Sequence, residues 1–265
     1  MVIVETCTNR PILQTCLLED YNFQIDPYIG CEHYCFYCYA LNQAETNWSK
    51  EINIHQNLVG QLSTELADIE PQTIYIGWNS DAYQSSEAKH QQTRQTLELL
   101  AEESFSVCIL TKSDLVIRDI DILKKMPGSS VGLSLAFQND HDRNLLERKT
   151  YPNEKRIEAL TKLQNAGIST YALICPVIPL ITDVRELIDQ ALPYVDSIWV
   201  YPLTVESDSS KNWLNTKSIL EKHFPNIARS TIEICLNSEH RYWKVLRSEL
   251  ELLRSEISVD LRIEI

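Results

Sequence analysis

The sequence predicts an α/β fold with parallel strands, and two observations lead to this expectation. Short apolar segments rich in β-branched residues alternate along the chain with longer segments of helical periodicity. Such alternation is typical of βαβ units, in which helices connect neighbouring parallel strands. The length of 265 residues suits one sizeable core, because single α/β barrels often have about this length.

Six apolar segments are expected to form the strands. The first, FQIDPYI, is bent at its end by Asp26-Pro27 and Gly30, since these residue types favour turns. The fifth is ended by Pro176 and Pro179. We therefore expect strands at 23–29, 73–77, 106–111, 131–137, 168–177 and 197–203.

The segments between these strands have the spacing of helices. Three leucines within residues 55–68 recur every four residues and therefore share one face of a helix. Gly167 is a suitable C-cap, and Thr182 or Asp183 is a suitable N-cap. The expected helices cover 55–68, 87–103, 114–125, 153–166 and 182–192.

Outside this region the patterns are weaker. Residues 1–22 show no clear period, and residues 41–54 are interpreted as a polar loop. Near the end of the chain, helical patterns cover about 210–223 and 239–254, followed by the strand-like SVDLRIEI. We expect an N-terminal extension, a core domain and a C-terminal extension packed on that core, over residues 1–22, 23–207 and 208–265 respectively.

The charge balance bears on the class of partner. The chain carries 24 basic and 37 acidic residues, which gives a net charge of −13. Nucleic-acid-binding proteins usually have a basic surface, because neutralising phosphates supplies much of their affinity. The acidic balance therefore favours a peptide or small-molecule partner over DNA.

The sequence also predicts a compartment. It shows no signal-peptide pattern and no apolar run near the ~20 residues that span a bilayer, so we expect a cytoplasmic protein without a membrane partner. The cytosol keeps thiols reduced, and the eight cysteines are interpreted as free thiols and metal ligands. Ordinary thiols are expected at Cys7, Cys16 and Cys235.

A cysteine motif, CEHYCFYCYA at residues 31–40, carries the strongest functional signal. Cys31, Cys35 and Cys38 are separated by three and then two residues. Cysteine thiolates hold iron–sulfur clusters, and three of them leave one iron of a four-iron cluster free to bind a small molecule. The alternative is structural zinc with His33 as the fourth ligand, although zinc sites usually have a second, distant CxxC pair, which this sequence lacks.

The motif resembles the C-x3-C-x2-C signature of the radical S-adenosylmethionine (SAM) superfamily. The resemblance implies a partial (β/α)6 TIM-type barrel over residues 23–207 and a [4Fe-4S] cluster whose free iron binds SAM. It also implies that an electron from a partner such as flavodoxin or ferredoxin leads to cleavage of SAM. The resulting 5′-deoxyadenosyl radical then abstracts a hydrogen atom from the substrate.

Polar residues follow the expected strands where a cofactor would bind. Ser80 and Asp81 offer acceptors for ammonium and ribose hydroxyl groups, and Lys112 offers a cation for a carboxylate. Ser134 lies on the fourth strand. Each of these residues alone is also compatible with turn or capping roles. Together, at equivalent ends of successive strands, they favour a cofactor pocket.

Residues 23–190 more closely resemble the spore photoproduct lyase-like branch of the superfamily, through DPYIGCEHYCFYCYA, GWNSDAYQ, LTKSDLVIRDIDIL, GLSLAF and PVIPLITD. The resemblance implies SAM contacts from Ser80, Asp81, Lys112 and Ser134. It further implies that Tyr37 lies near the adenine and that Tyr39 takes part in catalysis by radical transfer.

One position departs from the lyase pattern. Trp78 stands where the lyase has the cysteine that returns a hydrogen atom to product, and an indole cannot do so. Cys175, at a strand end, is either a replacement donor or a packed core thiol, and Cys108 is the other strand cysteine. This departure and the acidic composition both weigh against DNA repair.

The same branch also resembles enzymes that modify ribosomally made peptides. The resemblance implies a precursor peptide as substrate, splicease-like excision of a tyramine unit, and a small accessory protein that binds the leader. A photoproduct-lyase-like repair enzyme is the first alternative. The second is a non-catalytic iron–sulfur module that transfers electrons.

Overall fold

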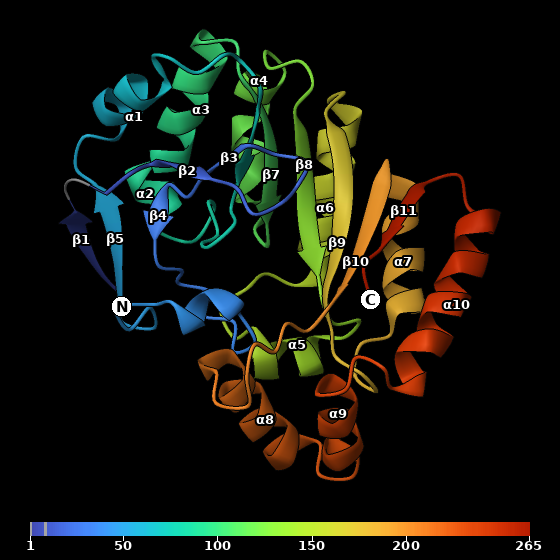
Figure 1. The fold of residues 1–265 in the computed structure, drawn as a ribbon. Coiled ribbons are helices and arrows are strands. Elements are labelled where there is room, and N and C mark those ends of the chain that lie inside the picture. Colours follow the sequence, from blue (N-terminus) through green and yellow to red (C-terminus); the bar gives the residue numbers. More distant parts are fainter. Residues whose placement is uncertain (1, 8–9) are drawn as a thin grey trace.

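The computed structural model describes residues 2–7 and 10–265. Within them, a curved sheet of eight strands has the order β11-β10-β9-β8-β7-β6-β3-β2 (Figure 1). Neighbouring strands are parallel except for the β2–β3 pair. The strands are β2 (Leu13–Thr15), β3 (Phe23–Ile25), β6 (Thr73–Ile76), β7 (Ser106–Thr111), β8 (Ser130–Leu135), β9 (Ser169–Val177), β10 (Ser197–Pro202) and β11 (Asp260–Ile263).

The sheet confirms the predicted fold class, an α/β partial barrel. Its order begins with β11 and ends with β2, and no pairing between these two strands occurs in the described residues. An ion pair between Arg262 Nη1 and Asp20 Oδ2, 2.7 Å long, links the two ends of the sheet. Residues from opposite ends of the chain therefore meet at the opening of the barrel.

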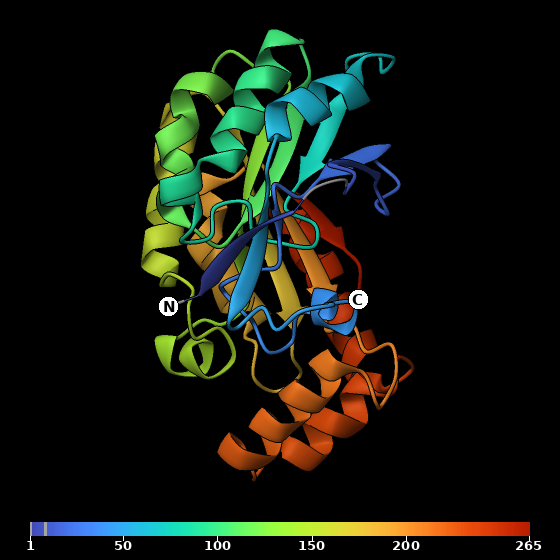
Figure 2. The ribbon, with the colours of Figure 1, turned by 90° about the vertical axis from the view of Figure 1, so that its left-hand side faces the viewer.

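Helices cover the outer face of the sheet (Figures 1 and 2). They bury aliphatic side chains against the strands, including Leu62, Leu97, Leu160 and Leu187, each 0 % exposed. The helices of this layer are α1 (Leu58–Leu66), α2 (Glu87–His90), α3 (Gln92–Glu102), α4 (Ile120–Leu123), α6 (Asn153–Asn165), α7 (Val184–Ala191) and α10 (Arg241–Glu256).

Two expected helices are divided. The helix expected over 87–103 is interrupted at Gln91, whose φ of +52° is left-handed and cannot continue a helix. The helix expected over 114–125 begins as a 3-10 helix, Asp114–Asp119, before α4. As expected, Asp183 caps α7 by accepting a hydrogen bond from the Glu186 N–H at 3.0 Å.

The first expected strand is wrong in its extent. β3 ends at Ile25, and Tyr28–Ile29 forms β4 in a separate sheet of order β1-β5-β4. Pro27 has no N–H to donate to a ladder, and the Asp26 carboxylate instead accepts hydrogen bonds from a neighbouring loop. The chain therefore changes sheets at Asp26-Pro27.

The small sheet also corrects two other expectations. β1 (Ile3–Cys7) lies in the segment read as having no clear period, and β5 (Glu51–His55) lies in the segment read as a polar loop. β5 has the sequence EINIH, in which Ile52 is fully buried and is flanked by polar residues. That alternation was the available signal for a strand with one buried face.

The C-terminal segment reaches two parts of the molecule. β11 adds a parallel strand to β10, whereas α8 (Lys211–His223) packs against the turn Tyr39–Asn42 that follows the cysteine motif. α8 forms a lobe with α5 (Asp140–Leu146) and α9 (Ala228–Cys235) (Figure 1), and neither α5 nor α9 was predicted. None of the described helices has the length and apolarity to cross a bilayer.

Candidate cofactor site

A cavity of about 100 Å³ brings together almost all the residues that the sequence singled out. All three motif cysteines and all five predicted cofactor-binding residues line it, whereas Tyr39 does not. They come from the loop after β4 and from the carboxyl ends of β6, β7 and β8, as in other parallel α/β proteins. The lining residues are Cys31, His33, Cys35, Tyr37, Cys38, Gly77, Asn79, Ser80, Asp81, Leu110, Thr111, Lys112 and Ser134.

The cysteine loop is held in place by the neighbouring loop after β6. Gln84 donates from Nε2 to the Gly30 carbonyl at 3.0 Å and accepts from the Glu32 N–H at 2.7 Å. Gly30 has a φ of +94°, and an added Cβ would lie 2.9 Å from the Trp48 ring. The chain therefore enters the motif through a conformation that glycine adopts readily.

The three thiols suit a cluster better than a single ion. In the described residues, no three His, Cys, Asp or Glu side chains converge as they would around one metal ion. In a cluster the cysteines bind different iron atoms, so they need not converge on one point. Burial, with Asp81 nearby, raises the pKa of Cys31 to about 12, and burial also raises the pKa of Cys35 and Cys38.

Asp81 forms the anionic end of the cavity. Its Oδ1 accepts from Thr111 Oγ1 at 2.6 Å, its Oδ2 accepts from the Lys112 N–H at 2.7 Å, and His33 Nδ1 lies 3.2 Å from Oδ2. Burial alone would raise the pKa of Asp81, but His33 and these donors outweigh it and hold the pKa below its usual range. His33 Nε2 is buried and has no hydrogen-bond partner in the part of the chain that the structure describes.

Ser80 is positioned by Asp26. Asp26 Oδ1 accepts from the N–H groups of Asn79 and Ser80 at 2.9 and 3.1 Å. The Ser80 hydroxyl itself donates to the Tyr28 carbonyl at 2.7 Å. The sequence had indicated only a turn at Asp26, whereas the structure shows that this carboxylate joins the cysteine-loop strand to the Ser80-Asp81 loop.

Lys112 and Ser134 form the cationic end of the cavity. Lys112 Nζ donates to Ser134 Oγ at 2.7 Å and lies 4.0 Å from Glu147 Oε1. Burial lowers the pKa of Lys112, but the Glu147 carboxylate together with the sulfurs of Cys35 and Cys175 outweighs burial, so the pKa is raised overall. The ammonium group is therefore charged.

Behind this end lies a buried ion pair that sequence reasoning missed. Glu147 and Arg156 both have side chains that are 0 % exposed, with Arg156 Nη2 2.7 Å from Glu147 Oε2. Arg156 Nη1 donates to the Ser134 carbonyl at 2.6 Å, and the Tyr37 hydroxyl donates to Glu147 Oε1. The pair thus contacts three predicted cofactor residues, namely Tyr37, Lys112 and Ser134.

Asn212 of α8 is a second residue that the sequence did not indicate. Its side chain is fully buried, and Nδ2 donates to the Tyr37 carbonyl at 3.2 Å and to the Thr204 carbonyl at 2.8 Å. Its N–H donates to Asn42 Oδ1 at 3.0 Å. A helix near the end of the chain therefore supports the backbone of the cysteine motif.

Tyr39 and Trp78 lie together at the mouth of the barrel. The Tyr39 hydroxyl donates to the Trp78 carbonyl at 2.5 Å, and the ring centroids are 5.7 Å apart. Cys108 points into the barrel interior, where its thiol donates to the Tyr171 hydroxyl at 3.4 Å. Cys175 lies on β9, where its carbonyl is 3.5 Å from Ser134 Oγ.

Comparison with known proteins agrees with this arrangement. A family model described as the radical SAM superfamily matches residues 25–191. An uncharacterized protein of Methanocaldococcus jannaschii is 32 % identical over 230 residues, which cover 84 % of each chain. An uncharacterized protein of Mycobacterium tuberculosis is 26 % identical over 197 residues, which cover 70 % of this chain and 58 % of that protein.

Two solved structures share the fold. Spore photoproduct lyase has a TM-score of 0.69 at 15 % identity, covering 99 % of this chain and 82 % of the lyase chain. Streptococcus suis SuiB bound to S-adenosylmethionine has a TM-score of 0.60 at 13 % identity, covering 91 % of this chain and 50 % of that chain. At these identities the similarity concerns the fold. The family match spans most of the barrel and includes the cysteine motif, and the chain therefore belongs to the radical SAM superfamily.

Proposed function

We propose that this radical SAM enzyme binds a [4Fe-4S] cluster and SAM at the cavity described above and acts on a peptide. The observation that carries the proposal is the meeting of three cysteines, an anionic end and a cationic end around one cavity. SAM is an amino acid joined to a nucleoside, so it presents a carboxylate, an ammonium group and ribose hydroxyls. Opposite charges at the two ends of the cavity suit such a ligand.

Each residue has a role in this proposal. Cys31, Cys35 and Cys38 would each bind one iron atom of the cluster. The bound [4Fe-4S] cluster would supply the reductive cleavage of SAM to a 5′-deoxyadenosyl radical. Lys112 would bind the SAM carboxylate, and Asp81 would accept from its ammonium or ribose hydroxyl groups. We assign Ser80 and Ser134 as further SAM contacts, Tyr37 as the adenine contact and Tyr39 as the residue for radical transfer.

The charges behind the cavity support the role of Lys112. Lys112 and Arg156 are cations, whereas Glu147 is the single carboxylate within ion-pair distance of either in the described residues. This group therefore has one uncompensated positive charge in a buried place. A carboxylate ligand would balance that charge, because buried charges need partners.

A peptide is the proposed substrate class. The net charge of −13 opposes the approach of a polyanion such as DNA, and Trp78 stands where a lyase-type donor thiol would be needed. We propose a ribosomally made precursor peptide, splicease-like excision of a tyramine unit, a small accessory protein that presents the peptide, and flavodoxin or ferredoxin as reductant.

Anaerobic reconstitution tests the proposed chemistry. The chain is loaded with iron and sulfide, then supplied with dithionite and SAM, and 5′-deoxyadenosine is measured by mass spectrometry. We expect 5′-deoxyadenosine from the wild-type chain and only background from Cys38→Ala. A wild-type sample with verified cluster content that forms no 5′-deoxyadenosine would contradict the proposal.

A further inference from the structure

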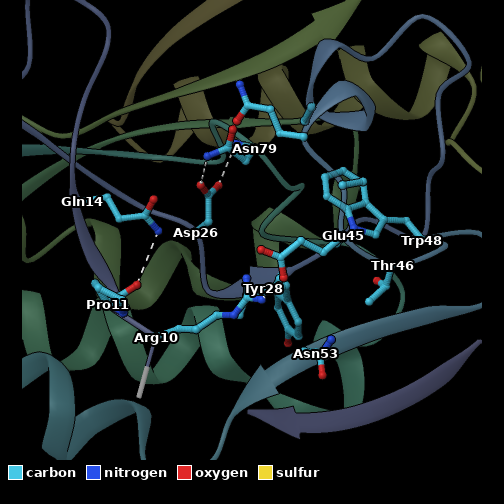
Figure 3. Close-up of a pocket in the computed structure, with 15 residues that line it drawn as sticks. Arg10, Pro11, Gln14, Asp26, Tyr28, Glu45, Thr46, Trp48, Asn53 and Asn79 are labelled. Atoms are coloured by element: carbon cyan, nitrogen blue, oxygen red, sulfur yellow. Dashed lines mark hydrogen bonds and ion pairs between the residues drawn. The ribbon is translucent and has the colours of Figure 1, made fainter. Parts of the chain in front are cut away.

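The cavity lined by the three motif cysteines is called the cofactor cavity below. A second and larger cavity lies beside it, and Asn79 lines both. Its volume is about 550 Å³, within the range of roughly 300–1,000 Å³ that is usual for ligand pockets. It is bounded by β2 of the large sheet and by Asp26 just after β3, by β4 and β5 of the small sheet, and by the chain that follows the cysteine motif (Figure 3). We call it the amide-lined cavity, because Gln14, Gln43, Asn53 and Asn79 are among its lining residues.

The position of this cavity ties it to the cysteine motif. Gly30, which immediately precedes Cys31, lines the cavity, and so does Ala40, two residues after Cys38. Asn79 lies at the boundary and is held there by Asp26, which accepts from its N–H and its Nδ2 at 2.9 and 2.8 Å (Figure 3). A molecule in the cavity therefore lies next to the place where SAM would be cleaved.

The space on the other side of the cofactor cavity is already filled. The barrel interior is packed by aromatic and apolar side chains, including the stacked rings of Tyr171 and Trp199, whose centroids are 4.5 Å apart. The cofactor cavity itself has a volume of about 100 Å³, which is below the range of roughly 300–1,000 Å³ that is usual for ligand pockets. The amide-lined cavity is the larger of the two cavities that Asn79 lines, and it has the size of a substrate site.

The lining of the cavity indicates the chemical class of its occupant. Side-chain amides both donate and accept hydrogen bonds, as the main chain of a peptide does. Asn53 and Gln43 line the cavity, and no side-chain hydrogen bond of either residue occurs within the part of the chain that the structure describes. Tyr28 and Trp48 add aromatic surface to the lining. Apolar side chains of a bound peptide could pack against these rings.

The charges in this cavity do not suit a nucleic acid. Arg10 is the single cation among the lining residues, and it is ion-paired with Glu45. The two side chains extend toward each other from opposite sides of the cavity (Figure 3). Phosphate recognition needs an excess of cations, whereas two acidic residues, Asp26 and Glu45, line this cavity beside Arg10.

We propose that the amide-lined cavity binds a segment of peptide substrate through hydrogen bonds to its main chain and presents it to the radical formed beside Asn79. This inference rests on the proposed function, because it takes the radical chemistry as given and assigns the substrate site. Recognition of the main chain does not depend on side-chain identity, so short peptides of mixed sequence can serve as a probe.

Deuterium transfer tests the proposal with the reconstituted enzyme. The probe is a mixture of tryptic peptides from a fully deuterated protein, and the parallel probe is fragmented, fully deuterated DNA. In the step that is measured, a deuterium atom leaves a peptide carbon and joins the 5′ carbon of the radical. The product is singly deuterated 5′-deoxyadenosine, and the carbon radical left on the peptide takes one electron from dithionite and one proton from water to form a C–H bond.

We expect deuterated 5′-deoxyadenosine with the peptides and none with the DNA. Asn53→Leu and Gln43→Leu should each lower the deuterated fraction about tenfold, which corresponds to one lost hydrogen-bond contribution of about 1.4 kcal/mol. Gln190→Leu is the matched control, because Gln190 lines a separate cavity beside α7. This control should leave the deuterated fraction unchanged.

Three results would overturn the inference. These are deuterium transfer from DNA but not from peptides, transfer from neither probe while unlabelled 5′-deoxyadenosine forms, and an unchanged deuterated fraction in both amide variants. Each leaves the radical chemistry intact and removes the peptide site, and transfer from DNA alone would also remove the proposed peptide substrate. A wild-type enzyme that forms no 5′-deoxyadenosine at all instead contradicts the proposed function, and the peptide site with it.

Discussion

The cofactor cavity and the amide-lined cavity share Asn79 but are built in opposite ways. Behind the cofactor cavity, Glu147 and Arg156 are both 0 % exposed and use their polar atoms on one another and on neighbouring groups. In the amide-lined cavity the one ion pair, Arg10 with Glu45, has side chains that are 46 % and 69 % exposed. Buried charge organises the first cavity, whereas solvent reaches much of the second.

This difference suits the two kinds of ligand that we propose for the two cavities. A buried and fully bonded network holds its side chains in one arrangement, which suits a cofactor of constant shape. Exposed ion pairs contribute little to stability. Within the described residues, the amides of Asn53 and Gln43 form no side-chain hydrogen bond that a ligand would have to replace. The second cavity can therefore adapt to segments of different sequence.

The largest effect is expected from removing a proposed cluster ligand from the cofactor cavity. Cys35→Ala removes a ligand of the proposed cluster, and we expect the iron content to fall strongly and 5′-deoxyadenosine formation to fall to background. Cys235→Ala is the control, since this thiol lies in α9, away from the cofactor cavity. Equal iron content in the two variants would contradict the assignment of Cys35 as a ligand.

The next effect concerns the buried ion pair. Arg156→Leu leaves the Glu147 carboxylate buried without its nearest cation, and we expect the free energy of unfolding to fall by about 3–5 kcal/mol. Urea unfolding of the apo chain measures this change. The double variant Glu147→Leu with Arg156→Leu should be more stable than the single variant, because it leaves no unpaired charge in the pair. The opposite order would show that the pair does not act as a unit.

A dependence on pH follows from the same carboxylate. Burial would raise the pKa of Glu147, but Arg156 and Lys112 outweigh it and lower the pKa from the usual 4.5 to about 2. A lowered pKa stabilises the fold fully above the unfolded value, and this contribution is lost as the pH falls from about 4.5 toward 2. Urea unfolding between pH 7 and pH 3 should show a steeper loss of stability in the wild type than in Glu147→Gln. Parallel curves would contradict this prediction.

The smallest effect is expected on the amide-lined side. Arg10→Gln removes an exposed ion pair, and the free energy of unfolding should change by no more than about 1 kcal/mol. The same urea titration compares this variant directly with Arg156→Leu. A loss as large as that of the buried pair would mean that the contrast between the two cavities is wrong.

Local patterns in the sequence were sufficient for the barrel strands and for much of the cofactor cavity. Each of the six expected strands after the first corresponds to a short apolar segment that is bounded by turn or polar residues. Parallel strands bring their carboxyl ends to one edge of the sheet. Ser80, Asp81, Lys112 and Ser134 could therefore be predicted to lie near the cysteine motif. The first strand and β5 were misjudged, because a proline turn and a single buried isoleucine are weak signals beside the polar residues around them. β1 and β2 were not predicted, because residues 1–22 show no clear period.

What the sequence determined by itself was the cysteine motif and the order of the strands that carry its companions, since both depend on short-range spacing. Only the tertiary structure decided that Glu147, Arg156 and Asn212 stand behind the site. Charged and amide side chains are mostly exposed in proteins, and these three become buried only when α6, α8 and the cysteine loop pack together. The same holds for the amide-lined cavity, whose walls come from two sheets that meet only in the folded chain.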